Sequence, residues 1–135
     1  MVYNLNKGKT MAYNSNIVRI SKTGITATGI GSYLMETTEN GTQKFFPIFA
    51  TFSITAATGI SVVPTFSVGT NAATYDNVIP ASVLTGLISV DKMTKIDISA
   101  ATSAVGANTA IYAAISVPAT AATCVVDVHL FGFYK

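Results

Sequence analysis

Hydrophobic and polar residues alternate along most of the chain from residue 17 onward. In the segment 46–54, one predicted inward face consists of Phe46, Ile48, Ala50, Phe52 and Ile54. In the segment 123–134, the predicted inward residues are Cys124, Val126, Val128 and Leu130. A period of two with many Val, Ile and Thr residues is typical of half-buried strands, and no segment keeps a helical stripe for more than about two turns. The pattern predicts an all-β chain.

Turn-forming residues separate these runs at short intervals. The pair Asn40-Gly41 tolerates positive φ and predicts a hairpin that joins 33–37 to 43–49. The predicted strands lie near 17–22, 30–37, 44–54, 61–69, 76–79, 83–90, 93–99, 110–117 and 123–134. Because the intervals leave no room for crossover helices, we expect an antiparallel β-sandwich of eight or nine strands, a jelly roll, as a single domain over 17–135.

Residues 1–16 have a different pattern from the rest of the chain. They are rich in Asn, and their larger apolar side chains are spaced without a strict period: Tyr3, Leu5, Met11 and Tyr13. A frayed terminus has this appearance, and so does an extended arm that orders when it docks on a neighbour. We interpret 1–16 as an N-terminal arm and these four residues as its docking side chains.

Charge is scarce in this sequence. Eight Lys and Arg and six Asp and Glu make up 10% of the residues, compared with about 25% in an average soluble protein. A net charge of +2 without a basic cluster argues against nucleic-acid binding. No apolar stretch reaches the roughly 18 residues of a membrane span, and the N-terminus lacks the apolar run of a signal peptide, so we expect a protein made in the cytoplasm.

Candidate catalytic groups are few. The single histidine, His129, lies two residues from Asp127 on the same predicted face, without a nucleophile elbow or an oxyanion loop. We therefore expect a surface pairing between strands rather than a general base. Cys124 is the single cysteine and is expected to be buried in a strand. The sequence predicts no enzymatic activity and no cofactor.

Two binding chemistries stay open as minor alternatives. Asn71, Asp76 and Asn77 crowd one loop, where their oxygens suit either calcium or the commoner Asx turns. Tyrosines offer a weak platform for stacking on sugars, although Trp is absent: Tyr33, Tyr75 and Tyr112.

Apolar side chains also occupy the predicted outward faces of two strand ends. Phe45, Pro47 and Phe49 lie opposite the inward set of their strand, and Phe131 and Phe133 do so near the C-terminus. Such side chains either pack under a loop or the arm, or contact another subunit. Since interface cores are depleted in charge, the low charge favours the second explanation. The predicted subunit contacts are Phe45, Phe49, Phe131 and Phe133.

Several stretches resemble small all-β head proteins of tailed bacteriophages. They are PTFSVGTN at 64–71, YDNVI at 75–79, LTGL at 84–87 and VDVHLFGFY at 126–134. The resemblance, over about residues 44–134, implies a capsid decoration (cement) protein on the outer capsid surface of the virion. It also implies a homotrimer that bridges major capsid protein subunits. Separately from the resemblance, we expect the arm residues Tyr3, Leu5, Met11 and Tyr13 to dock on the capsid. The alternative is a receptor- or glycan-binding β-domain of a phage head or tail fibre.

Overall fold

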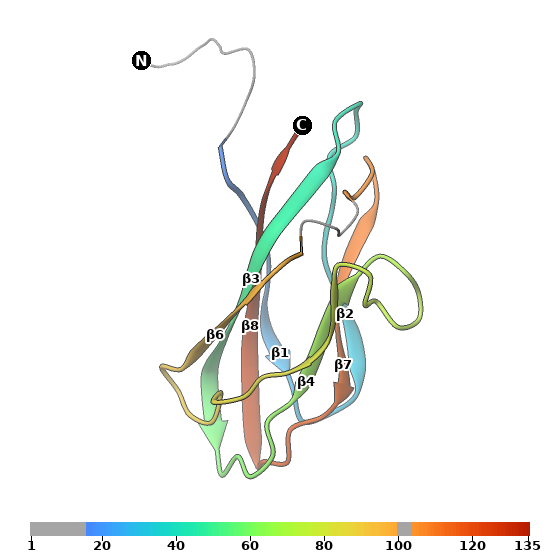
Figure 1. Cartoon of the computed structure of the whole chain (residues 1–135). Helices are drawn as coiled ribbons and strands as arrows, with labels where there is room; N and C mark the ends of the chain where they lie inside the picture. Colours follow the sequence, from blue (N-terminus) through green and yellow to red (C-terminus); the bar gives the residue numbers. More distant parts are fainter. Residues whose placement is uncertain (1–15, 100–103) are drawn as a thin grey trace.

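The computed structural model describes residues 16–99 and 104–135, which form eight strands without a helix (Figure 1). The strands are β1 (Val18–Thr26), β2 (Gly31–Thr37), β3 (Phe45–Thr58), β4 (Thr65–Gly69), β5 (Ile79–Val83), β6 (Met93–Asp97), β7 (Ala110–Val117) and β8 (Thr123–Tyr134). The expected all-β architecture is confirmed.

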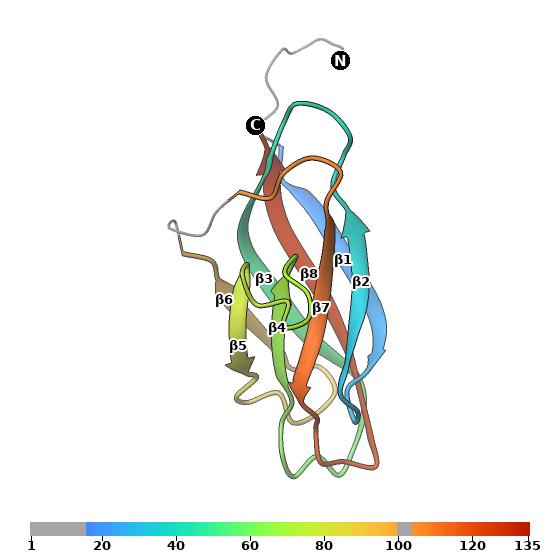
Figure 2. The same ribbon diagram turned by 90° about the vertical axis from the view of Figure 1, so that its right-hand side faces the viewer.

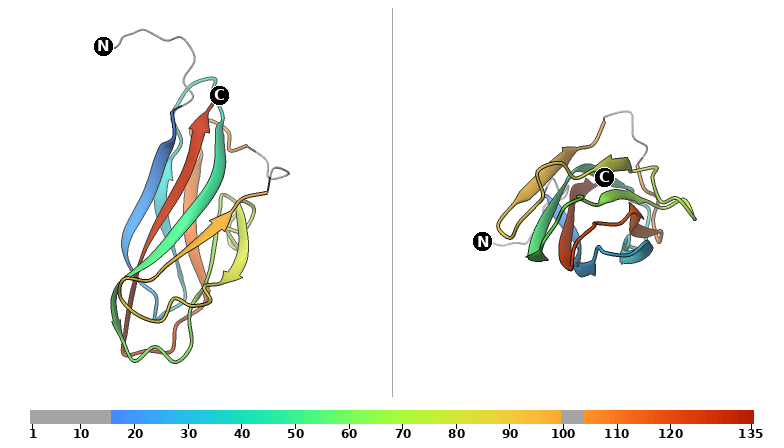
Figure 3. Two further views of the ribbon diagram at one scale, coloured as in Figure 1. Left: turned by 60° about the vertical axis from the view of Figure 1, so that its left-hand side comes forward. Right: turned by 90° about the horizontal axis from the view of Figure 1, so that it is seen from below.

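The strands form two antiparallel sheets that pack face to face. The first sheet has the order β1-β8-β3-β6 and comes forward in the left view of Figure 3. The second sheet has the order β2-β7-β4-β5 and faces the viewer in Figure 2. This is the strand order of a jelly roll, in which only β4 and β5 follow each other within one sheet. Every other connection crosses between the sheets.

Strand β8 shows how the sequence pattern produces the core. Its burial alternates over the whole strand, and Val126, Val128 and Leu130 are 0% exposed. The strand pairs with β1 on one side and β3 on the other, so each inward side chain meets the opposite sheet. The inward set predicted for 123–134 is therefore confirmed.

Strand β3 follows the predicted alternation only in its second half. Ala50, Phe52 and Ile54 are buried as expected, but the register against β8 shifts between Pro47 and Phe49. An extra residue in one strand of a pair moves all preceding side chains to the other face. The faces predicted for Phe45, Phe46 and Ile48 are accordingly wrong: Phe45 is 0% exposed in the core, Phe46 lies on the outer surface, and Ile48 is 37% exposed.

The predicted hairpin around Asn40-Gly41 is also wrong. Strands β2 and β3 belong to different sheets, and residues 38–44 cross between them. Buried Thr38 anchors this crossing: its hydroxyl donates to the Gly106 carbonyl at 2.7 Å and accepts from the Thr109 amide at 2.8 Å. An Asn-Gly pair predicts a turn, but it does not predict whether the strands before and after the turn pair with each other.

Within residues 16–99 and 104–135 there are eight strands, because the predicted segment 83–90 is a connection from Leu84 onward. Strand β5 ends at Val83, and the following turn places Leu84 and Leu87 in the core at 0% exposure. The Leu87 amide donates to the Leu84 carbonyl at 3.1 Å, and Gly86 between them has a φ of 86°. A positive φ favours glycine, so this residue allows the turn.

Candidate interaction surface

Four phenylalanines cover part of the outer surface of the first sheet. Phe46 and Phe133 stack with ring centroids 5.4 Å apart, and Phe49 and Phe131 stack with centroids 4.7 Å apart. All four rings are partly exposed. We call this surface, made of Phe46, Phe49, Phe131 and Phe133, the aromatic face. It comes from the two central strands, β3 and β8.

Charged residues border the aromatic face in the cross-strand register. Arg19 of β1 is opposite Phe131, and Asp97 of β6 is opposite Phe49. The Lys95 ammonium lies 3.0 Å from the Asp97 carboxylate and 5.3 Å from the centre of the Phe49 ring. An aromatic centre with a polar rim, and with Arg beside it, is the usual composition of a protein–protein interface.

Local packing explains how the face is held in place. Gly132 of β8 lies against the ring of buried Phe45, where an added Cβ would come within 2.7 Å of Phe45 Cζ and would also meet the Phe46 carbonyl oxygen. The Phe45 ring is tilted against Tyr134 with centroids 5.4 Å apart. The missing side chain at position 132 thus lets β3 approach β8 closely, between the two outer phenylalanine pairs.

The structure brings together three of the four predicted subunit contacts. Phe49, Phe131 and Phe133 share the aromatic face, whereas Phe45 is inside the core and offers no surface to a partner. Phe46, for which the hydrophobic pattern predicts a place in the core, belongs to the aromatic face instead. The shift of register that exposes Phe46 has no signal in the hydrophobic pattern. The predicted docking residues lie outside the described residues: Tyr3, Leu5, Met11 and Tyr13.

The histidine pairs across strands, as expected, with a partner that the sequence did not reveal. His129 Nδ1 lies 2.6 Å from the Ser21 hydroxyl of β1, which is its register partner. Asp127 instead accepts a hydrogen bond from the Gly24 amide at 2.8 Å. The carboxylate therefore holds the bulge of β1 between Lys22 and Ile25 rather than the imidazole. Ser21 and His129 are both partly buried on the outer side of the first sheet.

The loop 70–77 after β4 is closed by its own side chains. The side-chain oxygen Oδ1 of Asn71 accepts from the backbone amide of Asp76 at 2.8 Å, and the Asn71 side-chain Nδ2 donates to the Asp76 carboxylate at 2.7 Å. The Asn77 side chain accepts from the Thr70 amide at 2.7 Å. The side-chain oxygens of Asn71, Asp76 and Asn77 thus all accept hydrogen bonds from groups of the same loop. Hydrogen bonds from Asn71 and Thr74 hold the pKa of Asp76 below its usual value.

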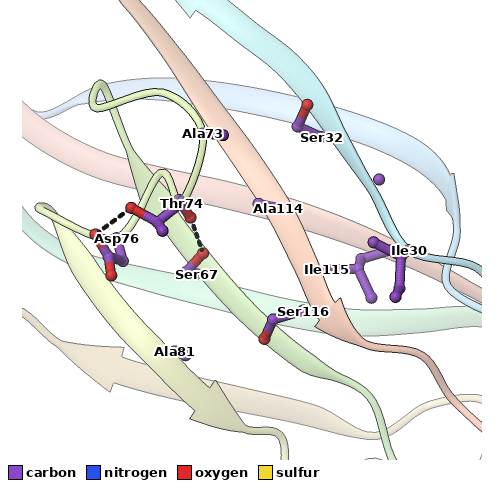
Figure 4. A pocket seen from close by; sticks show the side chains of 11 residues that line it. Ile30, Ser32, Ser67, Ala73, Thr74, Asp76, Ala81, Ala114, Ile115 and Ser116 are labelled. Atoms are coloured by element: carbon purple, nitrogen blue, oxygen red, sulfur yellow. Dashed lines mark hydrogen bonds between the residues drawn. The ribbon is translucent and has the colours of Figure 1, made fainter.

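This loop folds over the outer surface of the second sheet and borders a hollow (Figure 4). The hollow has a volume of about 420 Å³ and is lined by the loop and by residues of all four strands of the second sheet. Most side chains around it are small or carry hydroxyls: Ser32, Ser67, Ala73, Thr74, Ala81, Ala114 and Ser116. Asp76 lies at the loop side, and Ile30, 76% exposed, lies at the β2 side.

The tyrosines do not form an open platform beside this hollow. Tyr75 and Tyr112 contact each other, with ring centroids 4.5 Å apart, and Tyr33 packs against the core. Cys124 is buried, and burial raises the pKa of its thiol. Within 16–99 and 104–135 no three His, Cys, Asp or Glu residues gather as a metal-binding group. The same residues contain no helix with the length and hydropathy of a membrane span.

Comparisons with known proteins identify a shared fold. No protein-family model and no curated protein matches the chain. One chain of the cyanophage Pam1 capsid asymmetric unit has a similar structure, with a TM-score of 0.54 and 14% sequence identity. The similarity covers 96% of this chain and 93% of that chain. It therefore extends over nearly the whole length of both chains and shows that the jelly-roll architecture occurs in a phage capsid.

Proposed function

We propose that this chain is a structural, non-enzymatic virion protein that decorates the outer capsid of a bacteriophage. The aromatic face carries the proposal, because stacked rings on an outer sheet surface are expected to be covered by a protein partner. In this function, copies of the chain associate as a trimer and bind the major capsid protein. Binding then stabilises the contacts between neighbouring capsid subunits.

Two observations support this proposal. The fold is that of a chain in the cyanophage Pam1 capsid asymmetric unit, which covers 96% of this protein. The described polar groups also serve the structure: Asp127 holds a bulge, and Asn71 and Asp76 close a loop. A chain whose polar residues maintain its shape, and which keeps four aromatic rings on its outer surface, is suited to adhesion. Several modest contacts in one trimer give strong attachment through avidity.

The test compares virus particles with and without the protein. Particles that carry it should withstand higher temperature before they release DNA than particles from which it has been removed. Adding back the purified wild-type chain should restore the resistance, whereas the Phe49→Asp chain should restore less of it. Failure of the wild-type protein to bind particles, or binding without any gain in heat resistance, would contradict the proposal.

A receptor- or glycan-binding domain of a head or tail fibre is the second candidate. The hollow favours it, since the hydroxyls of Ser32, Ser116 and Thr74 and the carboxylate of Asp76 suit hydrogen bonding to sugar hydroxyls. Such a domain should bind host cells when it is isolated, and added host polysaccharide should compete with that binding. A decoration protein should remain on particles and should not bind cells.

A further inference from the structure

The two outer sheet surfaces differ in charge. Each Lys and Arg of the described residues lies on a strand of the first sheet or directly beside one: Arg19, Lys22, Lys44, Lys92, Lys95 and Lys135. Strands β2, β7, β4 and β5 and the loop 70–77 contain no cation, but they carry Glu36 and Asp76. The second sheet therefore presents negative charge without compensation on its own strands.

Ion pairing within the molecule does not neutralise the charge difference between the two sheets. Lys95 with Asp97 is the one ion pair between residues that the structure describes, and it lies within the first sheet. Arg19, on the exposed edge strand β1 beside Phe131, is not part of it. The carboxylate of Asp76 is held by the neutral groups of Asn71 and Thr74. A free cation thus lies beside the aromatic face, and an anion without a cationic partner lies beside the hollow.

The surfaces also differ in shape. The aromatic face consists of large, stacked rings, whereas the hollow is lined mostly by Gly, Ala and Ser and holds about 420 Å³ (Figure 4). Two faces that differ in charge sign and in side-chain size complement each other better than either complements itself. Electrostatic complementarity of this kind sets which surfaces meet and in which orientation.

We infer that copies of this chain associate head to tail, with the aromatic face of one copy against the second-sheet hollow of the next. Arg19 approaches the Asp76 side of the neighbour's hollow, and the four rings cover its small residues. A head-to-tail contact in which each copy uses two different surfaces closes into a ring when the rotation permits. The inference rests on the self-association in the proposed function and assigns the two surfaces that carry it.

The decisive experiment uses one variant of each surface. Phe49→Asp damages the aromatic face, and Ser116→Arg fills the hollow and adds a charge that repels the neighbour's Arg19. Ser116 is exposed and lines the hollow on β7. Each variant alone should associate at least about tenfold more weakly than the wild type in analytical ultracentrifugation. Ser89→Arg, an exposed site in the connection between β5 and β6, is the matched control and should associate as the wild type does.

Mixing the two variants distinguishes a head-to-tail contact from a symmetric one. The Phe49→Asp chain keeps an intact hollow, and the Ser116→Arg chain keeps an intact aromatic face. Their mixture should therefore form a one-to-one dimer that cannot grow into a ring. If aromatic faces paired with each other, Ser116→Arg would assemble normally and the mixture would contain no new species. Normal assembly of Ser116→Arg alone, or a mixture without the one-to-one dimer, overturns the inference.

A second pair of variants keeps the test valid if one chain fails to fold. Arg19→Asp and Ser32→Arg change exposed positions of the same two surfaces. Association of the wild type should also weaken as salt rises from 0.05 to 0.5 M, because screening acts on exposed charges. A wild type that stays monomeric up to 1 mM overturns the inference. Attachment to particles is measured separately, so the proposed decoration can hold when the head-to-tail contact does not.

Discussion

The rings of Phe49 and Phe131 lie 4.7 Å apart, with an angle of 16° between their planes, on the outer surface of a sheet. A stacked cross-strand pair adds about 1 kcal/mol or less to the stability of one chain. Its larger effect is expected between chains, where aromatic side chains dominate binding. Phe131→Ser should therefore change the stability of the isolated chain little and its association strongly.

Thermal unfolding at several concentrations separates these two effects. A protein that unfolds from an oligomer has a Tm that rises with concentration. The Tm of the wild type should rise between 1 and 100 μM, whereas that of Phe131→Ser should stay constant. Val125→Ser, on the outer side of the same strand but away from the four rings, is the control and should retain the concentration dependence. A constant Tm for the wild type would show that the rings are not covered by another copy.

Phe45 is expected to act through folding rather than association. Its ring is 0% exposed and packs against Tyr134, so Phe45→Ala removes buried contacts and leaves a cavity. Replacing a buried Phe by Ala lowers the free energy of unfolding by about 3–5 kcal/mol. Urea unfolding at low protein concentration should show this loss for Phe45→Ala and about 1 kcal/mol or less for Phe133→Ala. If Phe45→Ala and Phe133→Ala lowered the free energy of unfolding equally, the two rings would be equally buried, which contradicts the structure.

Gly132 is expected to tolerate no side chain. An added Cβ would lie 2.7 Å from Phe45 Cζ and would meet the Phe46 carbonyl, so Gly132→Ala must push β3 away from β8. Overpacking of this kind costs about 1–3 kcal/mol of unfolding free energy. Gly106→Ala is the control, because the nearest atom to its Cβ, Thr109 Oγ1, is 3.7 Å away. If the two alanine variants unfold at the same urea concentration, β3 and β8 are not in close contact at this position.

Regular strands could be predicted from the sequence, and irregular ones could not. The inward side chains of β8 follow a period of two without interruption, which is why Val126, Val128 and Leu130 were predicted correctly. In β3 one bulge reverses the faces of Phe45 and Phe46, and the hydrophobic pattern contains no sign of it because both faces carry phenylalanine. A period-two pattern gives the face of a residue only within an uninterrupted strand.

Contacts between distant segments were beyond sequence reasoning for a related reason. Ser21 and His129 are separated by 108 positions and meet only because β1 pairs with β8 in one particular register. The charge difference between the sheets likewise needs the strand order, since Arg19 and Lys95 are far apart in the chain yet belong to the same sheet. The scarcity of charge was visible in the composition, but its placement depends on topology.

The loop beside the hollow is expected to loosen in acid. Hydrogen bonds from Asn71 and Thr74 lower the pKa of Asp76, so these bonds favour the ionised carboxylate. A group whose pKa is lower in the folded state adds stability that is present above its ordinary value, about 3.9, and is lost as pH falls through the folded value. Hydrogen exchange in 70–77, corrected for its intrinsic pH dependence, should be constant from pH 7 to about 4 and then increase.

Substitution of Asp76 tests whether this carboxylate causes the change. Asp76→Asn keeps an acceptor oxygen but loses the charge, and hydrogen bonds to a charged group are roughly twice as strong as those between neutral groups. The variant should therefore exchange faster in 70–77 at pH 7 and show no further increase in acid. Asp91→Asn, at an exposed position in the connection between β5 and β6, should behave as the wild type does. If hydrogen exchange in 70–77 still increases in acid in Asp76→Asn, another group causes the loosening of the loop. The loop that borders the hollow would then not depend on the charge of Asp76.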